Sequence, residues 1–123
     1  MQPTLFEQLG ENNLTILVDR FYDLVFDHPR ISHLFKSSKE EIKEKQRLFL
    51  TQFLGGPPLY TQKHGHPMLR ARHNPHPIGD EDAEAWLSCM ALALDAVPVD
   101  ESLKEELFQR FVPTALFMVN KQR

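Results

Sequence analysis

The sequence is poor in cysteine, in blocks of like charge and in long apolar runs, and each shortage excludes a class of protein. Its one cysteine, Cys89, cannot form an internal disulfide, fits a reducing compartment and is interpreted as a small buried hydrophobe. The 14 Lys and Arg are scattered among 17 Asp and Glu, so the formal net charge of −3 argues against nucleic acid as a partner. The most apolar stretch, Trp86 to Val97, is too short to cross a bilayer, and the first residues lack a basic region followed by an apolar run. We therefore expect a soluble, cytoplasmic protein without a membrane partner.

Apolar residues recur at helical spacing along the chain, whereas no segment has the convincing alternation of a strand. With 123 residues, of which 41% are hydrophobic, the chain can fill one core, so we predict a single all-α domain. The predicted helices run from a capping box at Thr4 and Glu7 to Gly10, from about Leu14 to Asp27, from a second capping box at Ser38 and Glu41 to Leu54, from Pro67 to His73, from an N-cap at Asp80 to about Val97, and from about Asp100 onward with a kink at Pro113. The run Gly55-Gly56-Pro57-Pro58 ends the third of these helices, and the segment from there to Asp80 has room for one short helix.

Polar side chains interrupt the apolar faces of the predicted helices. Tyr22 lies at helical spacing from Val18 and Val25, so its phenol is expected to point into the core. Gln46 lies in the centre of an apolar stripe on the third helix, and Trp86 adds an indole N–H donor on a later one. A buried polar group without a partner costs roughly 1–3 kcal/mol, so each needs a hydrogen-bond partner, a water or a ligand. A backbone carbonyl would suffice for any one of them, but three directed at one core favour a ligand.

Four of the six histidines fall between residues 58 and 80. His64 with His66, or His73 with His76, could chelate a metal, and a zinc site is one interpretation. No second cysteine, H-E-x-x-H motif or nearby carboxylate completes such a site. His73 differs from the others because two arginines, one of them Arg72, stand close to it. An imidazole beside guanidinium groups suits a metal held inside an anionic cofactor that carries carboxylates.

The stretch FLTQFLGGPPLYTQKHGHPMLRARH (residues 49–73), with Phe21-Tyr22 upstream and AWLSCM (residues 85–90) downstream, resembles the truncated haemoglobins, specifically group II. The resemblance covers nearly the whole chain, and its most specific part is the G-G-P run together with L-R-x-R-H. It implies that residues 1–123 form a single truncated globin domain, in which two helices packed over two enclose one haem b. This fold agrees with the helices predicted above.

The resemblance also implies roles for individual residues. His73 matches the proximal histidine that ligates the haem iron, and Arg72 matches a partner of a haem carboxylate. Tyr22, Gln46 and Trp86 match polar positions that face a bound ligand on the distal side, where Ile42 replaces a small residue at the ligand entrance. The further expected haem contacts are Phe35, Lys45, Phe49, Leu50, Leu54, Tyr60, Met68, Met90 and Met118, of which Lys45 and Tyr60 are additional candidates for the carboxylates.

These roles predict a protein that binds dioxygen, and also carbon monoxide or nitric oxide, for oxygen binding, transport or sensing. Bound dioxygen carries partial negative charge, so a buried indole N–H or phenol O–H would slow its release. Haem-based redox catalysis, either nitric oxide detoxification or reaction with peroxide, is the alternative and would need a reductase for cycling. A helical interaction module without a cofactor is a third interpretation. We expect a monomer or a weak homodimer.

Overall fold

The computed structural model describes residues 3–29, 38–65 and 79–117, and the regular structure within these ranges is entirely helical. In chain order the helices are α1 (Leu5–Leu9), α2 (Glu11–Asp27), α3 (Lys39–Phe53), α4 (Leu59–His64), α6 (Asp80–Asp95) and α7 (Glu101–Phe117). The predicted all-α class is confirmed, whereas the helix predicted from Pro67 to His73 lies outside the described residues. Within the described ranges, no helix combines the length and the apolar character needed to span a membrane.

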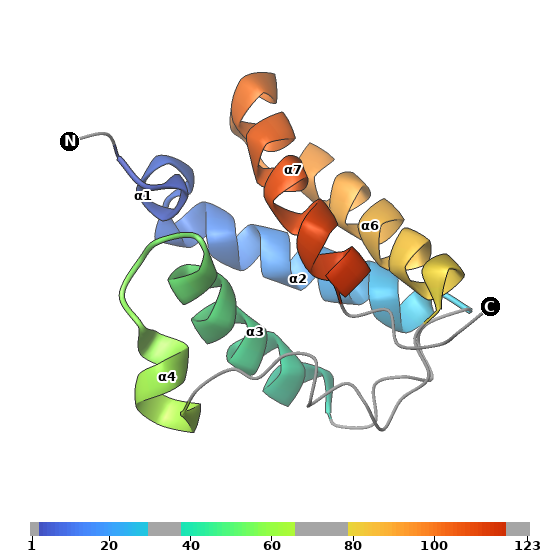
Figure 1. Ribbon diagram of the computed structural model, residues 1–123, viewed down its shortest axis with the longest axis horizontal. Helices are drawn as coiled ribbons and strands as arrows, with labels where there is room; N and C mark the ends of the chain where they lie inside the picture. Colours follow the sequence, from blue (N-terminus) through green and yellow to red (C-terminus); the bar gives the residue numbers. More distant parts are fainter. Residues whose placement is uncertain (1–2, 30–37, 66–78, 118–123) are drawn as a thin grey trace.

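Two pairs of long helices form the body of the fold (Figure 1). α2 packs against α3 and against α6, and α7 packs against α6. The short helices extend this body, since α1 contacts α2 and α7 while α4 contacts α3. The pairs α2–α3 and α6–α7 together give the expected two-over-two arrangement.

The core lies where the apolar faces of the long helices meet. Leu14, Leu17 and Val25 of α2, Met90 of α6 and Leu107 of α7 are all 0% exposed. Burying one such side chain stabilises the fold by roughly 1.5–3 kcal/mol, so these contacts hold α2, α6 and α7 together. The helical spacing of these residues in the sequence therefore predicts correctly that they belong to the core.

The first and third helices begin at the caps that the sequence predicts. Thr4 Oγ1 accepts a hydrogen bond from the Glu7 N–H at 3.1 Å, and the Glu7 carboxylate accepts one from the Thr4 N–H at 3.0 Å. Ser38 Oγ accepts a hydrogen bond from the Glu41 N–H at 3.2 Å. These bonds satisfy amides that the first turn of a helix leaves without a partner.

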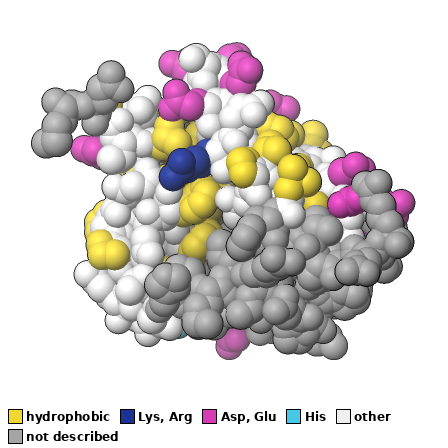
Figure 2. All heavy atoms as spheres, in the orientation of Figure 1, with side chains coloured by type: hydrophobic (Ala, Val, Ile, Leu, Met, Phe, Trp, Pro, Cys, Tyr) yellow, Lys and Arg dark blue, Asp and Glu magenta, His cyan; other side chains and the backbone are white. Residues whose placement is uncertain are grey.

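The start of α6 differs from the prediction. Gly79, and not Asp80, is the N-cap residue, and its N–H donates to the carboxylate of Asp82 at 2.9 Å. The cap is thus supplied from inside the helix, by the third helical residue, and needs no side chain at the capping position itself. Figure 2 shows acidic side chains near the beginnings of α6 and α7. Asp82 stands in the first turn of α6 and Glu101 in that of α7, where a carboxylate offsets the positive end of the helix dipole.

Helix α4 was not expected from the sequence pattern, which predicts the short helix of this segment further along the chain. It begins directly after Pro58, where the Leu59 N–H donates to Pro57 O at 2.8 Å, because proline is well suited to the start of a helix. Its one buried residue, Tyr60, is 5% exposed and meets the ring of Phe49 of α3 edge-on at 5.8 Å. A helix of six residues has no stability of its own, so this contact with α3 holds it in place.

The turn after α3 depends on two adjacent glycines for different reasons. Gly55 has φ +96°, a conformation that residues with a side chain rarely adopt. Gly56 has an ordinary φ, but a Cβ atom there would lie 2.7 Å from the ring of Phe6 in α1. The Phe6 N–H also donates to Leu54 O at 2.9 Å, so the turn and α1 are packed closely together.

Helix α7 runs through Pro113 as one continuous helix. Pro113 therefore lies inside the helix, where it removes one backbone N–H donor, and the kink expected at this residue stays a prediction.

Candidate functional site

Tyr22 lies on the face of α2 that packs into the core, as the sequence predicts. Its side chain is 3% exposed, and its ring lies 4.8 Å from that of Phe21 and 6.4 Å from that of Phe26. Burial raises the pKa of the Tyr22 phenol above its usual value, because the phenolate would lose its hydration in the core. The phenol is therefore protonated at neutral pH, so its O–H is a hydrogen-bond donor and not a phenolate acceptor.

Trp86 of α6 belongs to the same aromatic cluster. Its ring is edge-on to Phe21 at 5.0 Å and to Phe111 of α7 at 6.0 Å, and the side chain is half-buried. Edge-to-face pairs contribute roughly 0.5–1.5 kcal/mol beyond their buried area. Tyr22 and Trp86 are far apart in the sequence, and in the structure the rings of both residues contact the ring of Phe21.

Helix α3 carries the other two expected distal residues, Ile42 and Gln46. Both are half-buried, and Ile42 packs against the core. The buried residues of α3 all lie in its second half, from Leu48 to Thr51. Gln46 therefore stands at the border of the buried face, so its expected inward orientation is met in part.

The remaining expected haem contacts divide into three groups. Phe49, Leu50, Leu54, Tyr60 and Met90 are buried, Lys45 is exposed, and His73, Arg72, Phe35, Met68 and Met118 lie outside the described residues. The five buried residues belong to the same core cluster as Tyr22. The structure thus joins the expected apolar contacts into one interior, while the role of His73 stays a prediction.

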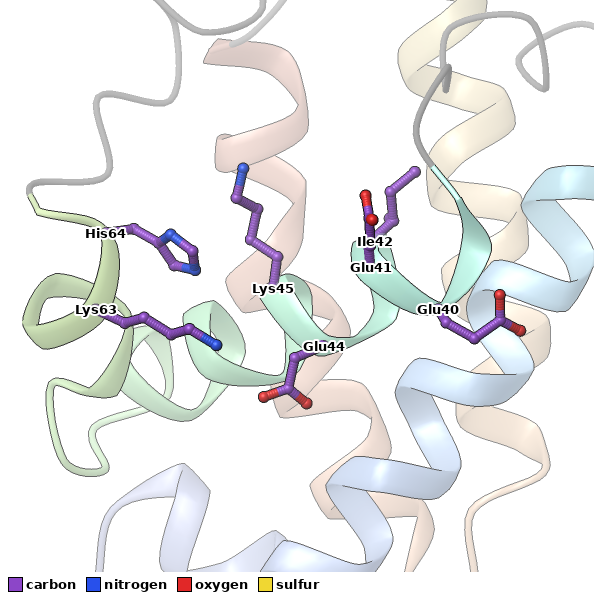
Figure 3. Close-up of a pocket in the computed structure, with 7 residues that line it drawn as sticks. All are labelled: Glu40, Glu41, Ile42, Glu44, Lys45, Lys63 and His64. Atoms are coloured by element: carbon purple, nitrogen blue, oxygen red, sulfur yellow. The ribbon is translucent and has the colours of Figure 1, made fainter.

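A pocket of about 520 Å³ opens between α3 and α4 (Figure 3). The described residues that line it are Glu40, Glu41, Ile42, Glu44, Lys45, Lys63 and His64. Two of the residues predicted from the sequence, Ile42 and Lys45, are among them. The pocket therefore connects the expected ligand entrance with an expected carboxylate partner.

Lys63 and His64 are lining residues that sequence reasoning missed in this role. His64 was considered only as half of a metal-chelating pair with His66, which lies outside the described residues. Within the described ranges, no group of three or more His, Cys, Asp or Glu side chains is placed to hold a metal ion. A helix predicted over residues 59–64 would have revealed that Lys63 and His64 are in its last turn, beside α3.

An ion-pair cluster joins α2 to α3 at the rim of the site. The carboxylate of Asp23, the residue after Tyr22, lies 2.7 Å from Lys39 Nζ and 3.2 Å from Lys43 Nζ. Hydrogen bonds from Lys39 and then from Lys43 hold the pKa of Asp23 below its usual value, and the same contact raises the pKa of Lys39. The cluster links the two helices that carry the expected distal residues.

Comparison with known proteins places this arrangement in one family. The model of the family described as bacterial-like globin matches residues 4–120. Group 2 truncated hemoglobin YjbI of Bacillus subtilis is 53% identical over 116 residues, which cover 94% of this chain and 88% of that protein.

Solved structures give the same result. The group II truncated hemoglobin of Bacillus anthracis superposes with a TM-score of 0.93 at 50% identity and covers 100% of this chain and 96% of its own. The truncated oxygen-avid haemoglobin of Bacillus subtilis superposes with a TM-score of 0.91 at 52% identity, covering 96% of this chain and 100% of its own. Both the sequence and the helical arrangement of this chain are thus similar to those of these proteins over nearly their full length.

Proposed function

This chain belongs to the bacterial-like globin family as a group II truncated haemoglobin, and on that basis we propose that it binds haem b through His73 and holds dioxygen beside Tyr22, Trp86 and Gln46. As a haem globin, it takes diatomic gases as its class of ligand. The choice of dioxygen is supported by the similarity to the truncated oxygen-avid haemoglobin of Bacillus subtilis and by the polar residues expected on the distal side. Oxygen capture, transport or sensing is the corresponding role.

The residues present fit a haem. The pocket of about 520 Å³ falls within the roughly 300–1,000 Å³ that is typical of cofactor and ligand sites. The basic residues toward its α4 end, Lys45, Lys63 and His64, suit the carboxylate-bearing edge of the cofactor, and Ile42 offers an apolar contact. The described lining also holds Glu40, Glu41 and Glu44, and of these Glu44 is paired with Arg47. Once bound, the haem supplies an iron centre that coordinates a diatomic gas reversibly.

The single observation that carries the proposal is the buried phenol of Tyr22 in one aromatic cluster with the indole of Trp86. Burial keeps the proton on Tyr22 Oη, and the indole N–H of Trp86 does not ionise, so both groups remain hydrogen-bond donors at neutral pH. The low-dielectric surroundings of the buried Tyr22 strengthen a hydrogen bond to a partly negative ligand. Phe21 packs against both rings and fixes their positions.

The proposal is tested first by the visible spectrum of purified protein reconstituted with haem, reduced and exposed to carbon monoxide. We expect stoichiometric haem and a sharp carbon monoxide band, both lost in His73→Gly and partly restored by added imidazole. A colourless protein that folds without haem would instead support the interaction-module interpretation. Zinc found in its place by metal analysis would support the chelating histidine pairs.

Dioxygen release tests the distal donors separately. Tyr22→Phe and Trp86→Phe each remove one donor while keeping a ring, and a hydrogen bond to a charged group is worth about 1.5–3 kcal/mol, so dioxygen release should become roughly ten- to a hundredfold faster. Leu92→Ala, at a position 57% exposed, is the control and should leave the rate unchanged. An unchanged rate in Tyr22→Phe and in Trp86→Phe would refute the assignment of these donors.

The same two donors favour one second candidate, haem-based redox catalysis with nitric oxide or peroxide. A phenol and an indole that polarise dioxygen can also polarise a peroxide. This function would require a reductase as a partner for cycling. Turnover with either substrate that does not exceed that of free haem would refute it, and turnover that falls in Tyr22→Phe would support it.

A further inference from the structure

We infer that His64, together with Lys45, binds a carboxylate of the haem, so that the carboxylate edge of the cofactor lies at the α4 end of the pocket. This inference rests on the proposed function, because it concerns how the haem is oriented. The roles implied by the family resemblance do not include His64. The assignment follows from the ring contacts that position the imidazole, from the distribution of charge along the pocket and from the direction of Lys45.

His64 is positioned by a series of ring contacts that begins in the core. The ring of Phe49 meets Tyr60 edge-on at 5.8 Å, and Tyr60 lies 5.0 Å from the imidazole of His64. Phe49 and Tyr60 are both buried, whereas His64 is half-buried. Because the imidazole packs against a fixed ring, orienting it toward a ligand costs less conformational entropy than orienting a solvated side chain.

Charge is unevenly distributed along the pocket (Figure 3). Glu40 and Glu41 stand in the first turn of α3, at one end. Lys63 and His64 stand in the last turn of α4, at the other end, and Lys45 projects from α3 between these groups. A carboxylate is therefore attracted toward α4 and repelled from the beginning of α3.

The remaining carboxylate of the described lining, Glu44, does not oppose this attraction. It forms an ion pair with Arg47 of its own helix at 2.8 Å and points away from Lys45 and His64 in Figure 3. The side chains of Lys45 and His64 lie on the same side of α3 in that view. An ammonium and an imidazole N–H are both donors, and their hydrogen bonds to a carboxylate are of the strong, charge-assisted kind.

The test compares two cofactors that differ at this edge, where one carries ionised carboxylates and the other neutral methyl esters. Holoprotein is reconstituted with haem or with haem dimethyl ester, whose carboxylates are blocked, and the transfer of each to excess apomyoglobin is followed by absorbance. His64→Phe keeps the ring that packs on Tyr60 but removes both nitrogen atoms, and His64→Gln restores one donor. Gln62→Phe places the same ring on the exposed side of α4 and serves as the matched control.

We expect His64→Phe to accelerate the loss of haem about two- to tenfold, with His64→Gln between it and the wild type. This is less than a fully buried charge-assisted hydrogen bond would give, because His64 is half-buried and Lys45 is exposed, so solvent screens the interaction. With haem dimethyl ester, the wild type and His64→Phe should lose the cofactor at equal rates. Equal acceleration for both cofactors would show a packing effect and overturn the inference, as would no acceleration for either. Failure of the wild type to bind haem at all would overturn the proposed function itself, whereas stoichiometric haem binding that is insensitive to His64 would overturn the carboxylate assignment alone.

Discussion

Substitution of Gly56 by alanine should destabilise the protein, although the backbone angle of this glycine is compatible with alanine. A Cβ atom at position 56 would lie 2.7 and 2.8 Å from ring atoms of Phe6 and 2.8 Å from the backbone oxygen of Thr51. The Phe6 ring could shift, but the Thr51 oxygen accepts a hydrogen bond from the Gly56 N–H at 2.8 Å and cannot retreat without losing it. The clash therefore has no inexpensive relief.

The size of the effect follows from two opposing contributions. Overpacking of this kind costs about 1–3 kcal/mol, and two close contacts place Gly56→Ala in the upper part of that range. Replacing glycine also restricts the unfolded chain, which returns about 0.4–1 kcal/mol. The net decrease in the free energy of unfolding should be about 1–2.5 kcal/mol, measured by urea denaturation of wild type and variant at equal haem saturation with circular dichroism at 222 nm.

A double-mutant cycle with Phe6→Ala separates the two contacts. In the Phe6→Ala background the ring is absent, so Gly56→Ala should cost less, but some cost should persist because the Thr51 oxygen is still present. A coupling energy near zero would show that the ring contact contributes nothing. If Gly56→Ala were neutral or stabilising in the wild-type background, the steric reasoning for this turn would be refuted.

Three further predictions concern charge, the core and the proline of α7. The pKa of Asp23 is lowered, so the stabilisation by its carboxylate is present above about pH 4 and is lost as the pH falls. Asp23→Asn should reduce the free energy of unfolding at pH 7 by less than about 1 kcal/mol, because the carboxylate is partly exposed. The difference between wild type and variant should vanish near about pH 2 and in high salt. Leu107→Ala removes a side chain that is 0% exposed and should cost about 2–5 kcal/mol in urea denaturation, whereas Leu116→Ala, at 55% exposed, should cost little; equal costs would contradict the described core. Pro113→Ala restores a backbone N–H inside α7 and should raise the melting temperature, and a lower value would show that the proline has a packing role that outweighs the missing bond.

The long helices and the core could be predicted from the sequence because they depend on local spacing. Leu14, Leu17 and Val25 recur on one face of α2, and the structure buries all three. The inward position of Tyr22 was visible for the same reason, as a polar side chain in an apolar stripe. The half-burial of Gln46 could not be predicted from the sequence. Helical spacing fixes which residues share a face, but not how far along α3 the packing against other helices extends.

Helix α4 and its pocket residues could not be predicted, because the information that creates them is not local. Two prolines precede the helix and it spans six residues, so neither its length nor its spacing distinguishes it from a loop. Its position depends on the burial of Tyr60 against Phe49, which belongs to another helix. His64 therefore looked like half of a chelating pair in the sequence, whereas in the structure it is a pocket residue of α4.

Neighbouring residues in the sequence set both the ion pair between α2 and α3 and the positions of the expected distal residues. Asp23 directly follows Tyr22 on α2, and Lys43 directly follows Ile42 on α3, and Asp23 and Lys43 form an ion pair at 3.2 Å. Because successive residues point in directions about 100° apart on a helix, the register that buries Tyr22 necessarily brings Asp23 to the rim. The pair is partly exposed and therefore sensitive to salt. Ionic strength therefore acts on the ion pair between α2 and α3 without acting directly on Tyr22, which is buried and carries no charge at neutral pH.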